Sequence, residues 1–278
     1  MPRRTSGGLR VFVFGAGKAG ASLARALRAR GVATKLRAAR LGLPRAIDAD
    51  IVILAVRDRD LAPLAAELRD AGLVPKRAVV VHVAGALGPE PLAALRGSCA
   101  GVAQMHPMIS FASLRWAPDL ARGNVHVQGD PRAVTRARRL VRILGMTPRT
   151  IAALDPIAYH AAAGLVANGA AALAAVGAEL LVRAGVAHTV APKMLGPLLR
   201  SVAENVERLG FPEALTGPVR RGDRAGLEKH LATLRAKLPS AVSLYLAAAE
   251  AQLPLARAIG DAPGESFDAI AEALATAR

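Results

Sequence analysis

Polar side chains recur at helical spacing in the second half of the chain, where most neighbouring residues are apolar. His160 and Asn168 are eight residues apart in the stretch DPIAYHAAAGLVAN, with Gly164 between them, so a helix places all three on one face. Ser201 and Asn205 repeat the four-residue spacing. Histidine can transfer a proton near neutral pH, and an amide can orient a substrate's oxygen or nitrogen. The same groups could instead hydrogen-bond between helices in an apolar core, so both interpretations are kept.

Two further histidines end apolar runs that are typical of buried strands. His82 ends the run VVVHV and His106 ends the run AQMHPM. Because ligands of parallel sheets gather at the carboxyl ends of strands, either histidine could lie beside a cofactor. We predict catalytic roles for His160, Asn168 and His106 and a cofactor contact for His82, with hydrogen-bonded structural histidines as the alternative. Three isolated histidines are expected at the surface: His126, His188 and His230.

A loop rich in glycine and proline, ALTGPVRRGD, carries groups that suit a carboxylate substrate. Arginine can hold a carboxylate through two parallel hydrogen bonds. We predict substrate binding by five side chains of the second half: Ser201, Asn205, Thr216, Arg220 and Arg221. Asp223, at the end of this loop, is more simply explained as the N-cap of a helix that starts at Arg224. No set of residues has metal-ligand spacing, so no metal site is predicted.

The most specific signal is a glycine-rich turn near the N-terminus. The stretch VFVFGAGKAGASLARAL indicates a strand, then Gly15-x-Gly17-x-x-Gly20, then a helix. In such a turn the first glycine allows the bend, the second lets a pyrophosphate approach the backbone, and the third lets the helix pack on the strand. The pyrophosphate would bind at the positive N-terminus of the helix. We predict that a dinucleotide contacts six consecutive residues: Gly15, Ala16, Gly17, Lys18, Ala19 and Gly20.

The residues after the second predicted strand favour NADP over NAD. NAD-binding domains usually have a carboxylate about 20 residues after the glycine turn, where it holds the ribose 2′-hydroxyl. In this chain no acidic residue occurs before Asp48, whereas Arg37 and Arg40 follow the strand. A guanidinium can bind a 2′-phosphate that a carboxylate would repel. We therefore predict NADP, with Arg37 and Arg40 at its 2′-phosphate and with the run Ala55-Val56-Arg57-Asp58 on its other side. Asp58 could equally cap the helix that follows.

Composition excludes several classes of protein. With 53% hydrophobic and 21% charged residues among 278, the chain can bury a core and is not disordered throughout. The single cysteine, Cys99, excludes a disulfide scaffold and a cysteine-built zinc site. The N-terminal residues lack the apolar region of a signal peptide, so we expect a cytoplasmic protein. Only 3% of the residues are aromatic, which is unfavourable for a surface that stacks nucleic-acid bases.

The formal net charge of +16 lies entirely in the first half of the chain. Residues 1–154 contain 25 Lys and Arg against 9 Asp and Glu, whereas residues 155–278 contain 12 of each kind. Such a charge attracts a phosphorylated cofactor, a nucleic acid or an acidic surface, unless it is only a compositional habit. Because the sequence has no helix-turn-helix, RNP or zinc-finger pattern, we expect no specific nucleic-acid partner.

The order of apolar runs predicts an α/β fold with two domains. Short strand-like runs alternate with helical segments such as 19–29 and 61–71, which indicates βαβ units and a doubly wound parallel sheet. The strand-like runs are 9–14, 33–36, 50–56, 78–83, 102–105 and 125–128. Beyond Asp155 only helices are predicted, over 157–184, 192–209, 224–238, 240–252 and 267–277. We therefore predict a dinucleotide-binding Rossmann domain over 1–153 and an all-helical substrate and dimerisation domain over 154–278.

One segment is long enough to cross a membrane. Residues 156–178 carry no charge, but they are mostly alanine and glycine and are flanked by Asp155 and Glu179. Small side chains let two helices approach each other closely. We therefore expect this helix at a domain or subunit interface, and no membrane partner.

Along nearly its whole length the chain resembles bacterial Rossmann-like proteins with a C-terminal domain of unknown function, DUF2520. The matching stretches are FGAGKAG, VILAVRD, HVAG, MHPMISF, QGD, DPIAYHAAAGLVAN and ALTGPVRRGD. These proteins resemble the ketopantoate, pyrroline-5-carboxylate and prephenate reductase and dehydrogenase group, whose helical domain, like that of 6-phosphogluconate dehydrogenase, usually forms a dimer. Ala84 departs from the pattern because it stands where a serine is expected.

The resemblance implies a homodimeric, NADP-dependent oxidoreductase. It would transfer hydride from NADPH to the carbonyl or imine carbon of a small carboxylate, for example a 2-oxo acid such as ketopantoate. In this interpretation His160 supplies the proton, while Asn168 and an arginine of the glycine- and proline-rich loop orient the substrate. The alternative is an NADP-binding sensor or assembly module that performs no turnover.

Overall fold

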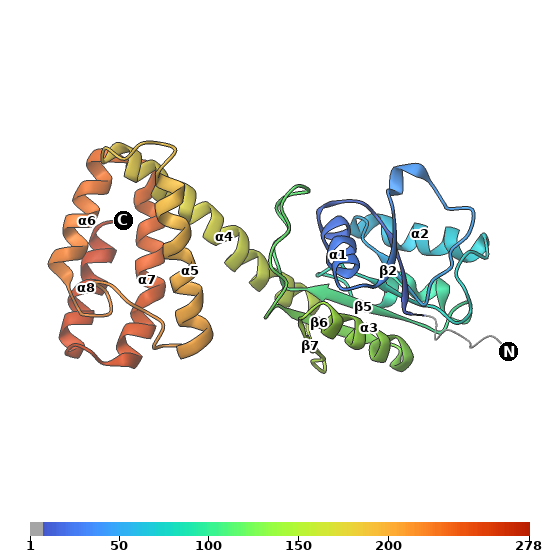
Figure 1. Ribbon diagram of the computed structural model, residues 1–278. Helices are drawn as coiled ribbons and strands as arrows, with labels where there is room; N and C mark the ends of the chain where they lie inside the picture. Colours follow the sequence, from blue (N-terminus) through green and yellow to red (C-terminus); the bar gives the residue numbers. More distant parts are fainter. Residues whose placement is uncertain (1–7) are drawn as a thin grey trace. The chain divides into compact units, whose positions relative to one another are not determined.

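The chain divides into two units, Met1–Leu165 and Val166–Arg278, in a computed structural model that describes residues 8–278 (Figure 1). The division lies inside one long helix, α4 (Pro156–Arg183). The predicted domain boundary at 153/154 stands just before the start of this helix. The first turns of α4 therefore belong to the first unit, together with the residues that they contact there.

A seven-stranded sheet forms the centre of the first unit. Its order is β2-β1-β3-β4-β5-β6-β7, and neighbouring strands are parallel except at the antiparallel pair β5 and β6. The strands are β1 (Arg10–Phe14), β2 (Ala33–Arg37), β3 (Ile51–Leu54), β4 (Val79–His82), β5 (Gly101–Pro107), β6 (Asn124–Gly129) and β7 (Thr147–Arg149). The predicted doubly wound Rossmann domain is confirmed.

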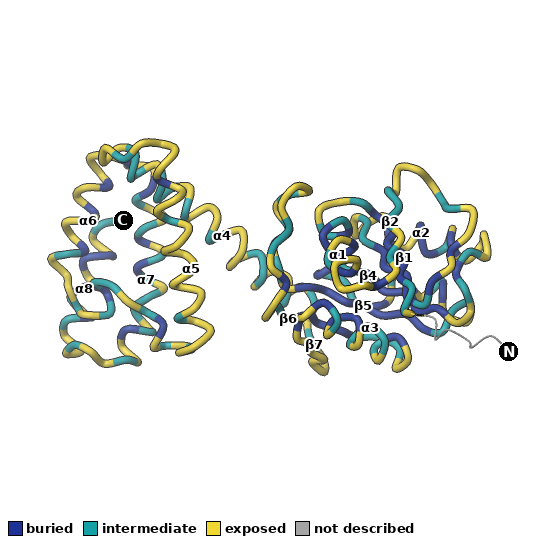
Figure 2. The backbone as a smooth tube through the Cα atoms, viewed as in Figure 1, coloured by how far each residue is buried: buried dark blue, intermediate teal, exposed yellow. Residues whose placement is uncertain are grey.

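Helices cover both faces of this sheet, which explains why its central strands β3, β4 and β5 are buried at every position. Alternate residues point to opposite faces, so Val11 and Val13 of β1 pack with one group of helices while Phe12 and Phe14 pack with the other. One group is α1 (Lys18–Ala29) and α3 (Pro131–Ile143). The other is α2 (Asp58–Asp70) and the 3₁₀ helix η2 (Glu90–Leu95); a second 3₁₀ helix, η1 (Ala39–Leu41), follows β2. Figure 2 shows the buried strands between their exposed helices.

The second unit is all-helical, as predicted. It contains the remainder of α4 together with α5 (Ala191–Leu209), α6 (Arg224–Lys237), η3 (Pro239–Ala241), α7 (Val242–Ile259) and α8 (Gly264–Thr276). Its main core joins α6, α7 and α8 around Leu227, Leu246 and Phe267. Asp223 caps α6 by accepting a hydrogen bond from the Gly226 N–H at 2.8 Å, which confirms the simpler interpretation of that residue.

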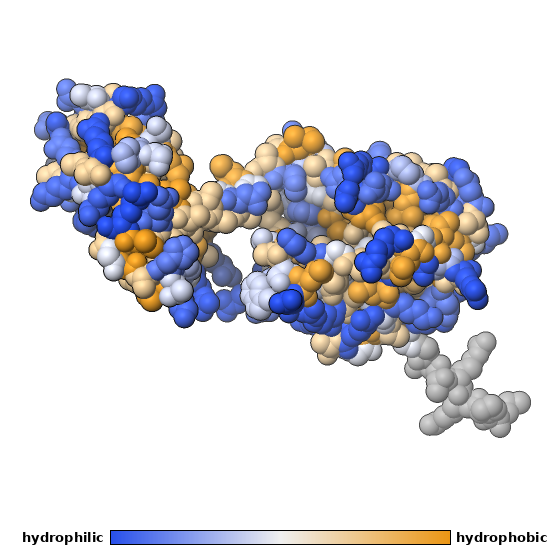
Figure 3. All heavy atoms as spheres, turned by 90° about the horizontal axis from the view of Figure 1, so that it is seen from above, coloured by the Kyte–Doolittle hydropathy of each residue, from blue (hydrophilic) through white to orange (hydrophobic). Residues whose placement is uncertain are grey.

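The helices α4 and α5 expose several large apolar side chains each. On α5 only Ala191 is buried, and four apolar residues spaced four apart are 38% to 57% exposed: Met194, Leu198, Val202 and Val206. The helix α4 has no buried residue and is long and apolar enough to cross a membrane by length and composition, which on its own is weak evidence. Its exposed side chains are mainly small apolar ones, drawn as tan atoms in Figure 3.

Candidate functional site

The glycine-rich turn connects β1 to α1 and is packed tightly at two of its three glycines. Gly15 has φ of 112°, a left-handed conformation that favours glycine, and its N–H donates to the Arg37 carbonyl at 2.8 Å. A Cβ added at Gly15 would overlap the Ala55 carbonyl, and one at Gly20 would overlap the Gly15 carbonyl. These two glycines are therefore required by the packing of the turn itself.

Gly17 differs because, in the described part of the chain, no atom other than those of Gly17 and its two chain neighbours lies within 4 Å of where its Cβ would be. It is the N-cap residue of α1, and no side chain caps that helix end. The first N–H groups of α1 consequently lack a side-chain acceptor and face open space, which is the arrangement that binds phosphate at a helix N-terminus. Lys18, in the first turn, is exposed, and Ala19 is half-buried.

A pocket of about 480 Å³ opens in front of this turn. It is formed by the turn, the residues after β2 and the residues after β3, and its lining is Gly15, Ala16, Gly17, Ala38, Ala39, Arg40, Ala55, Val56, Arg57 and Asp60. Parallel strands bring their carboxyl ends to one edge of the sheet, and this pocket lies at that edge. Of the predicted cofactor contacts, Gly15, Ala16, Gly17, Arg40, Ala55 and Val56 thus meet around one cavity.

The two arginines predicted at the 2′-phosphate have different surroundings. The Arg37 guanidinium donates to three carbonyls of the loop after β2: Gly42 at 2.8 Å, Leu41 at 2.6 Å and Leu43 at 3.1 Å. It fastens that loop and is not among the residues that line the pocket. Arg40 is exposed, lines the pocket and has no hydrogen-bond or ion-pair partner within residues 8–278. Arg57, which the sequence placed with Ala55 and Val56 on the other side of the cofactor, lines the pocket in the same way.

His82 is engaged entirely with the backbone. It is fully buried; its Nε2–H donates to the Gly88 carbonyl at 2.8 Å, and its Nδ1 accepts from the Ala84 N–H at 3.2 Å. Burial lowers the pKa of His82, so the ring is neutral near pH 7. The geometry favours the alternative of a structural histidine, which shapes the turn from Ala84 to Gly88. Buried Gln104 on β5 supports the same turn by donating to the Ala84 carbonyl at 2.8 Å.

The imidazole rings of His106 and His160 lie close together beside the turn from Ala84 to Gly88. His106, 9% exposed, lies near the carboxyl end of β5, and exposed His160 lies in the first turns of α4; their ring centroids are 5.8 Å apart. A Cβ added at Gly85 would lie 2.7 Å from His106 Nε2 and closer still to His160 Nδ1. The absence of a side chain at Gly85 is what allows the two imidazoles to approach each other.

Two further side chains, Tyr159 and His126, join His106 and His160 in a histidine cluster, and sequence reasoning missed both. The Tyr159 hydroxyl lies 3.2 Å from His106 Nδ1, and the two rings are edge to face with centroids 5.5 Å apart. His126, which was expected at the surface, is only 2% exposed, because it stands opposite His106 across the β5–β6 pair. Its Nε2 bonds the Gln128 Oε1 at 3.1 Å, while its Nδ1 is buried without a hydrogen-bond partner. The position of His126 between two valines of one apolar run, Val125 and Val127, was the signal that could have placed it inside, since all three are buried.

The surroundings of His106 keep its imidazole neutral. Its pKa falls to about 4, first because of burial and then because of the neighbouring imidazoles of His160, His126 and His82. Burial raises the pKa of the Tyr159 hydroxyl, which therefore stays protonated. At neutral pH His106 can thus donate or accept hydrogen bonds, but it is not a protonated acid.

The remaining predicted residues lie in the second unit. Asn168, Ser201, Thr216 and Arg221 are exposed there, and Asn205 is half-buried. The Ser201 hydroxyl donates to the Leu198 carbonyl at 2.7 Å. Arg220 is held in place by Asp261 at 2.6 Å and by the Leu215 carbonyl at 2.7 Å, which makes it part of the structure of its loop. The surface histidines His188 and His230 are exposed, as expected.

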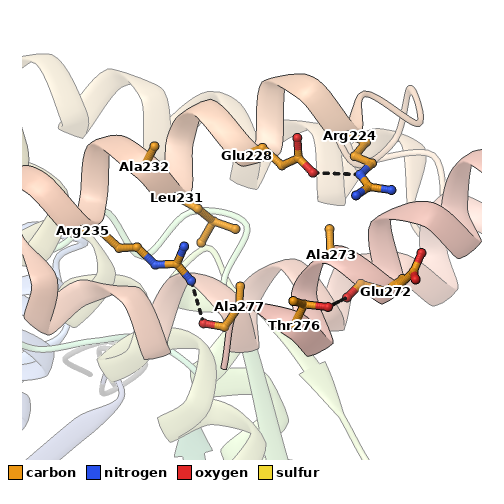
Figure 4. Close-up of a pocket in the computed structure, with 9 residues that line it drawn as sticks. All are labelled: Arg224, Glu228, Leu231, Ala232, Arg235, Glu272, Ala273, Thr276 and Ala277. Atoms are coloured by element: carbon orange, nitrogen blue, oxygen red, sulfur yellow. Dashed lines mark hydrogen bonds and ion pairs between the residues drawn. The ribbon is translucent and has the colours of Figure 1, made fainter.

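A second hollow, of about 340 Å³, lies between α6 and α8 (Figure 4). Two arginines line it, but Arg224 pairs with Glu228 at 2.8 Å and Arg235 donates to the Ala277 carbonyl at 2.9 Å. Both arginines are thus already engaged. Among residues 8–278 no three His, Cys, Asp or Glu residues are grouped so that they could hold a metal ion.

Comparison with known proteins agrees with this architecture. Residues 124–252 match the family described as domain of unknown function (DUF2520), so the resemblance seen in the sequence is confirmed over these residues. None of the curated proteins compared with the chain matches it.

Solved structures with this fold include enzymes with bound nicotinamide dinucleotides. A candidate NADP oxidoreductase from Bacteroides fragilis is 21% identical with a TM-score of 0.66, covering 88% of this chain and 98% of that one. Pyrroline carboxylate reductase from Plasmodium falciparum with NADP is 13% identical with a TM-score of 0.59, covering 91% and 98%. Imine reductase from Myxococcus stipitatus with NADP⁺ is 16% identical with a TM-score of 0.56, covering 96% and 99%. At these identities the likeness shows the fold.

Proposed function

We propose that this chain, which carries a DUF2520 domain over residues 124–252, is an NADPH-dependent reductase of a carbonyl or imine bond. The observation that carries the proposal is the uncapped N-terminus of α1 beside the open space at Gly17, in a pocket lined by two arginines that have no partner within residues 8–278. The fold is shared with an imine reductase and a pyrroline carboxylate reductase that bind NADP, which supports this class of reaction.

The residues of the pocket fit a dinucleotide phosphate. The free N–H groups of α1 would hold the pyrophosphate, and Arg40 and Arg57 would attract the 2′-phosphate. The strand order β1, β3, β4, β5 then leads along one sheet edge from the glycine turn to Gly85 and His106. When bound, NADPH would supply the hydride.

The histidine cluster supplies the groups that act on the substrate. Neutral His106 would donate a hydrogen bond to the oxygen or nitrogen of the double bond, and exposed His160 would deliver the proton to that atom. A small carboxylate such as ketopantoate is the substrate class expected from the sequence, and a cyclic imine is the second class to test. We further propose a soluble homodimer formed through the helical domain, supported by the exposed apolar residues of α5.

Binding and turnover separate an enzyme from a sensor that only binds the cofactor. Calorimetry should show tighter binding of NADPH than of NADH, and absorbance should show NADPH oxidation with a 2-oxo acid or a cyclic imine. The His160→Ala variant should bind NADPH normally and lose at least about 100-fold in turnover, the usual contribution of a general acid. Binding without oxidation of NADPH by any tested substrate would favour the sensor.

Arg40 tests the cofactor preference. Replacing Arg40 by Ala should weaken NADPH binding about 10-fold or more and leave NADH binding unchanged, because one charge-assisted contact to the 2′-phosphate is lost. Arg45, an exposed arginine that does not line the pocket, is the matched control, and Arg45→Ala should bind both dinucleotides as before. Equal losses for NADPH and NADH in the Arg40 variant would contradict this role.

A further inference from the structure

The tyrosine beside His106 has no part in the function proposed above. Tyr159 lies in the first turn of α4, half-buried, and its hydroxyl has one hydrogen-bond partner, His106 Nδ1 at 3.2 Å. The other nitrogen of the same ring, Nε2, has no hydrogen-bond partner in the described part of the chain and faces Gly85. Nδ1 of His106 is therefore hydrogen-bonded within the protein, whereas Nε2 faces the space beside Gly85.

The direction of the Tyr159–His106 hydrogen bond decides which nitrogen carries the proton. A phenol is a better donor than a neutral imidazole N–H, and an imidazole nitrogen is a better acceptor than a phenol oxygen. Burial keeps both groups uncharged, since it lowers the pKa of His106 to about 4 and raises the pKa of Tyr159. The hydroxyl therefore donates to Nδ1, and the ring proton resides on Nε2.

The tautomer of His106 determines whether its Nε2, beside Gly85, is a hydrogen-bond donor or an acceptor. His106 Nε2–H points into the space where His160 Nδ1 also lies, and the two nitrogens are not hydrogen-bonded to each other. The neighbouring side chains of His82 and Gln104 do not alter the arrangement of these two nitrogens, because both side chains are buried and hydrogen-bonded to backbone groups. The Nε2–H donor of His106 and the proton-transferring imidazole of His160 thus lie close together beside Gly85, which has no side chain.

We infer that Tyr159 is a positioning residue that holds His106 in its Nε2–H tautomer, so that His106 and His160 together address one heteroatom of the substrate. The inference rests on the proposed function for the identity of that heteroatom, the oxygen or nitrogen of the bond being reduced. The tautomer itself is a property of the free protein and can be measured without a substrate.

Long-range proton–nitrogen NMR correlation on protein labelled with ¹⁵N-histidine distinguishes the two tautomers. The chain has six histidines, and the signals that disappear in a His106→Gln variant identify His106. At neutral pH the wild-type protein should show the proton on Nε2 of His106. In Tyr159→Phe the ring should lose this preference and show a mixture of both tautomers.

The chain contains a matched control. Its only other tyrosine, Tyr245, bonds His230 Nδ1 at 2.9 Å in the second unit, again with edge-to-face rings. Tyr245→Phe should change the signals of His230 and leave those of His106 untouched. If the reductase activity is found, Tyr159→Phe should lower kcat about 10-fold or more and leave the KM for NADPH unchanged, whereas Tyr245→Phe should alter neither.

Two results would overturn the inference: a wild-type spectrum with the proton on Nδ1 of His106, or an unchanged His106 spectrum in Tyr159→Phe. The wild-type spectrum provides the test by itself if the variant does not fold. A confirmed tautomer in a protein that never oxidises NADPH would contradict the proposed function while leaving the role of Tyr159 intact.

Discussion

At the scale of single residues, the site depends as much on missing side chains as on those present. Gly15 and Gly20 are packed against neighbouring backbone, Gly17 faces open space, and Gly85 leaves room for two imidazoles. A sequence motif cannot distinguish a glycine that packing requires from one that a ligand requires. The structure makes this distinction, and each kind of glycine responds differently to an added methyl group.

The pair Gly17→Ala and Gly20→Ala tests this distinction. Gly17 has φ of −68° and free space around its Cα, so Gly17→Ala should fold with an unchanged Tm and bind NADPH at least about 10-fold more weakly. Gly20→Ala forces a methyl group against the Gly15 carbonyl, and such overpacking typically costs about 1–3 kcal/mol of unfolding free energy. Thermal unfolding and calorimetry with NADPH measure both effects. Full NADPH affinity in Gly17→Ala would show that no pyrophosphate approaches this residue.

The low pKa of His106 predicts sensitivity to acid. An unfolded histidine titrates near pH 6.5, whereas folded His106 has a pKa of about 4, so between these values the unfolded chain binds a proton that the folded chain does not. The contribution to stability is therefore complete above about pH 6.5 and is lost as the pH falls toward 4, amounting to at most about 3 kcal/mol. Burial of His82 acts in the same direction.

Urea unfolding at about pH 7 and about pH 4.5 measures this loss. His106→Gln should show a smaller difference between the two conditions than the wild-type protein. His188→Gln changes an exposed histidine of the second unit and should retain the wild-type difference. If the His106 variant retains it as well, another group causes the acid sensitivity.

At the scale of elements, the sequence predicts the helices and strands that have a strong apolar pattern. It does not predict a strand that forms only because it pairs with a neighbouring strand. The strands around Val11 and Val80 are visible in the chain as short continuous apolar runs. The helix beginning near Ala191 is visible because its apolar residues recur every three to four positions. The strand β7 has three residues, one of them Pro148, and exists because it pairs with β6. The antiparallel direction of β6 has no signature in its residues either.

The same limit explains which site residues were found. His160 was predicted from its spacing, but α4 is apolar around its whole circumference, so the sequence does not show which face meets the sheet. Tyr159, one position earlier, proved to be the residue that contacts His106. Arg37 and Arg40 look alike in sequence, and only the fold of the following loop shows that carbonyl groups occupy Arg37.

The helix α5 allows a prediction about assembly. A row of large apolar side chains exposed to water is typical of an interface, so we expect the row containing Leu198 and Val202 to be covered in a homodimer. Replacing both residues by Glu should convert the dimer to a monomer in sedimentation velocity while the helical circular dichroism is retained. Arg200→Glu alters the charge elsewhere on the same helix and should remain dimeric. A wild-type monomer at all concentrations would exclude this interface.

At the scale of the whole molecule, the two units differ in charge as well as in architecture. The excess of +16 lies within residues 1–154, and part of it is exposed on α3, where Arg132, Arg139 and Arg142 have no hydrogen-bond or ion-pair partner in the described structure. Other arginines act structurally: Arg77 joins Asp48 at 2.6 Å, Arg136 of α3 donates to backbone carbonyls, and Arg37 fastens its loop. Arg40 and Arg57 line the pocket where an anionic cofactor would bind and would draw anions toward it.

Such a surface must also attract nucleic acid, and the dependence of that binding on salt and on base sequence shows whether it is specific. Binding through arginine–phosphate contacts alone releases counterions, so the affinity should fall steeply with salt and should not depend on base sequence. In fluorescence polarisation, two DNA duplexes of unrelated sequence should bind equally at about 20 mM salt and be released at about 150 mM, where exposed charges are screened beyond roughly 8 Å. NADPH, held by paired contacts in a pocket, should lose less affinity over the same range. Sequence-dependent DNA binding that survives the higher salt would instead assign the charge of the first unit to a nucleic-acid function.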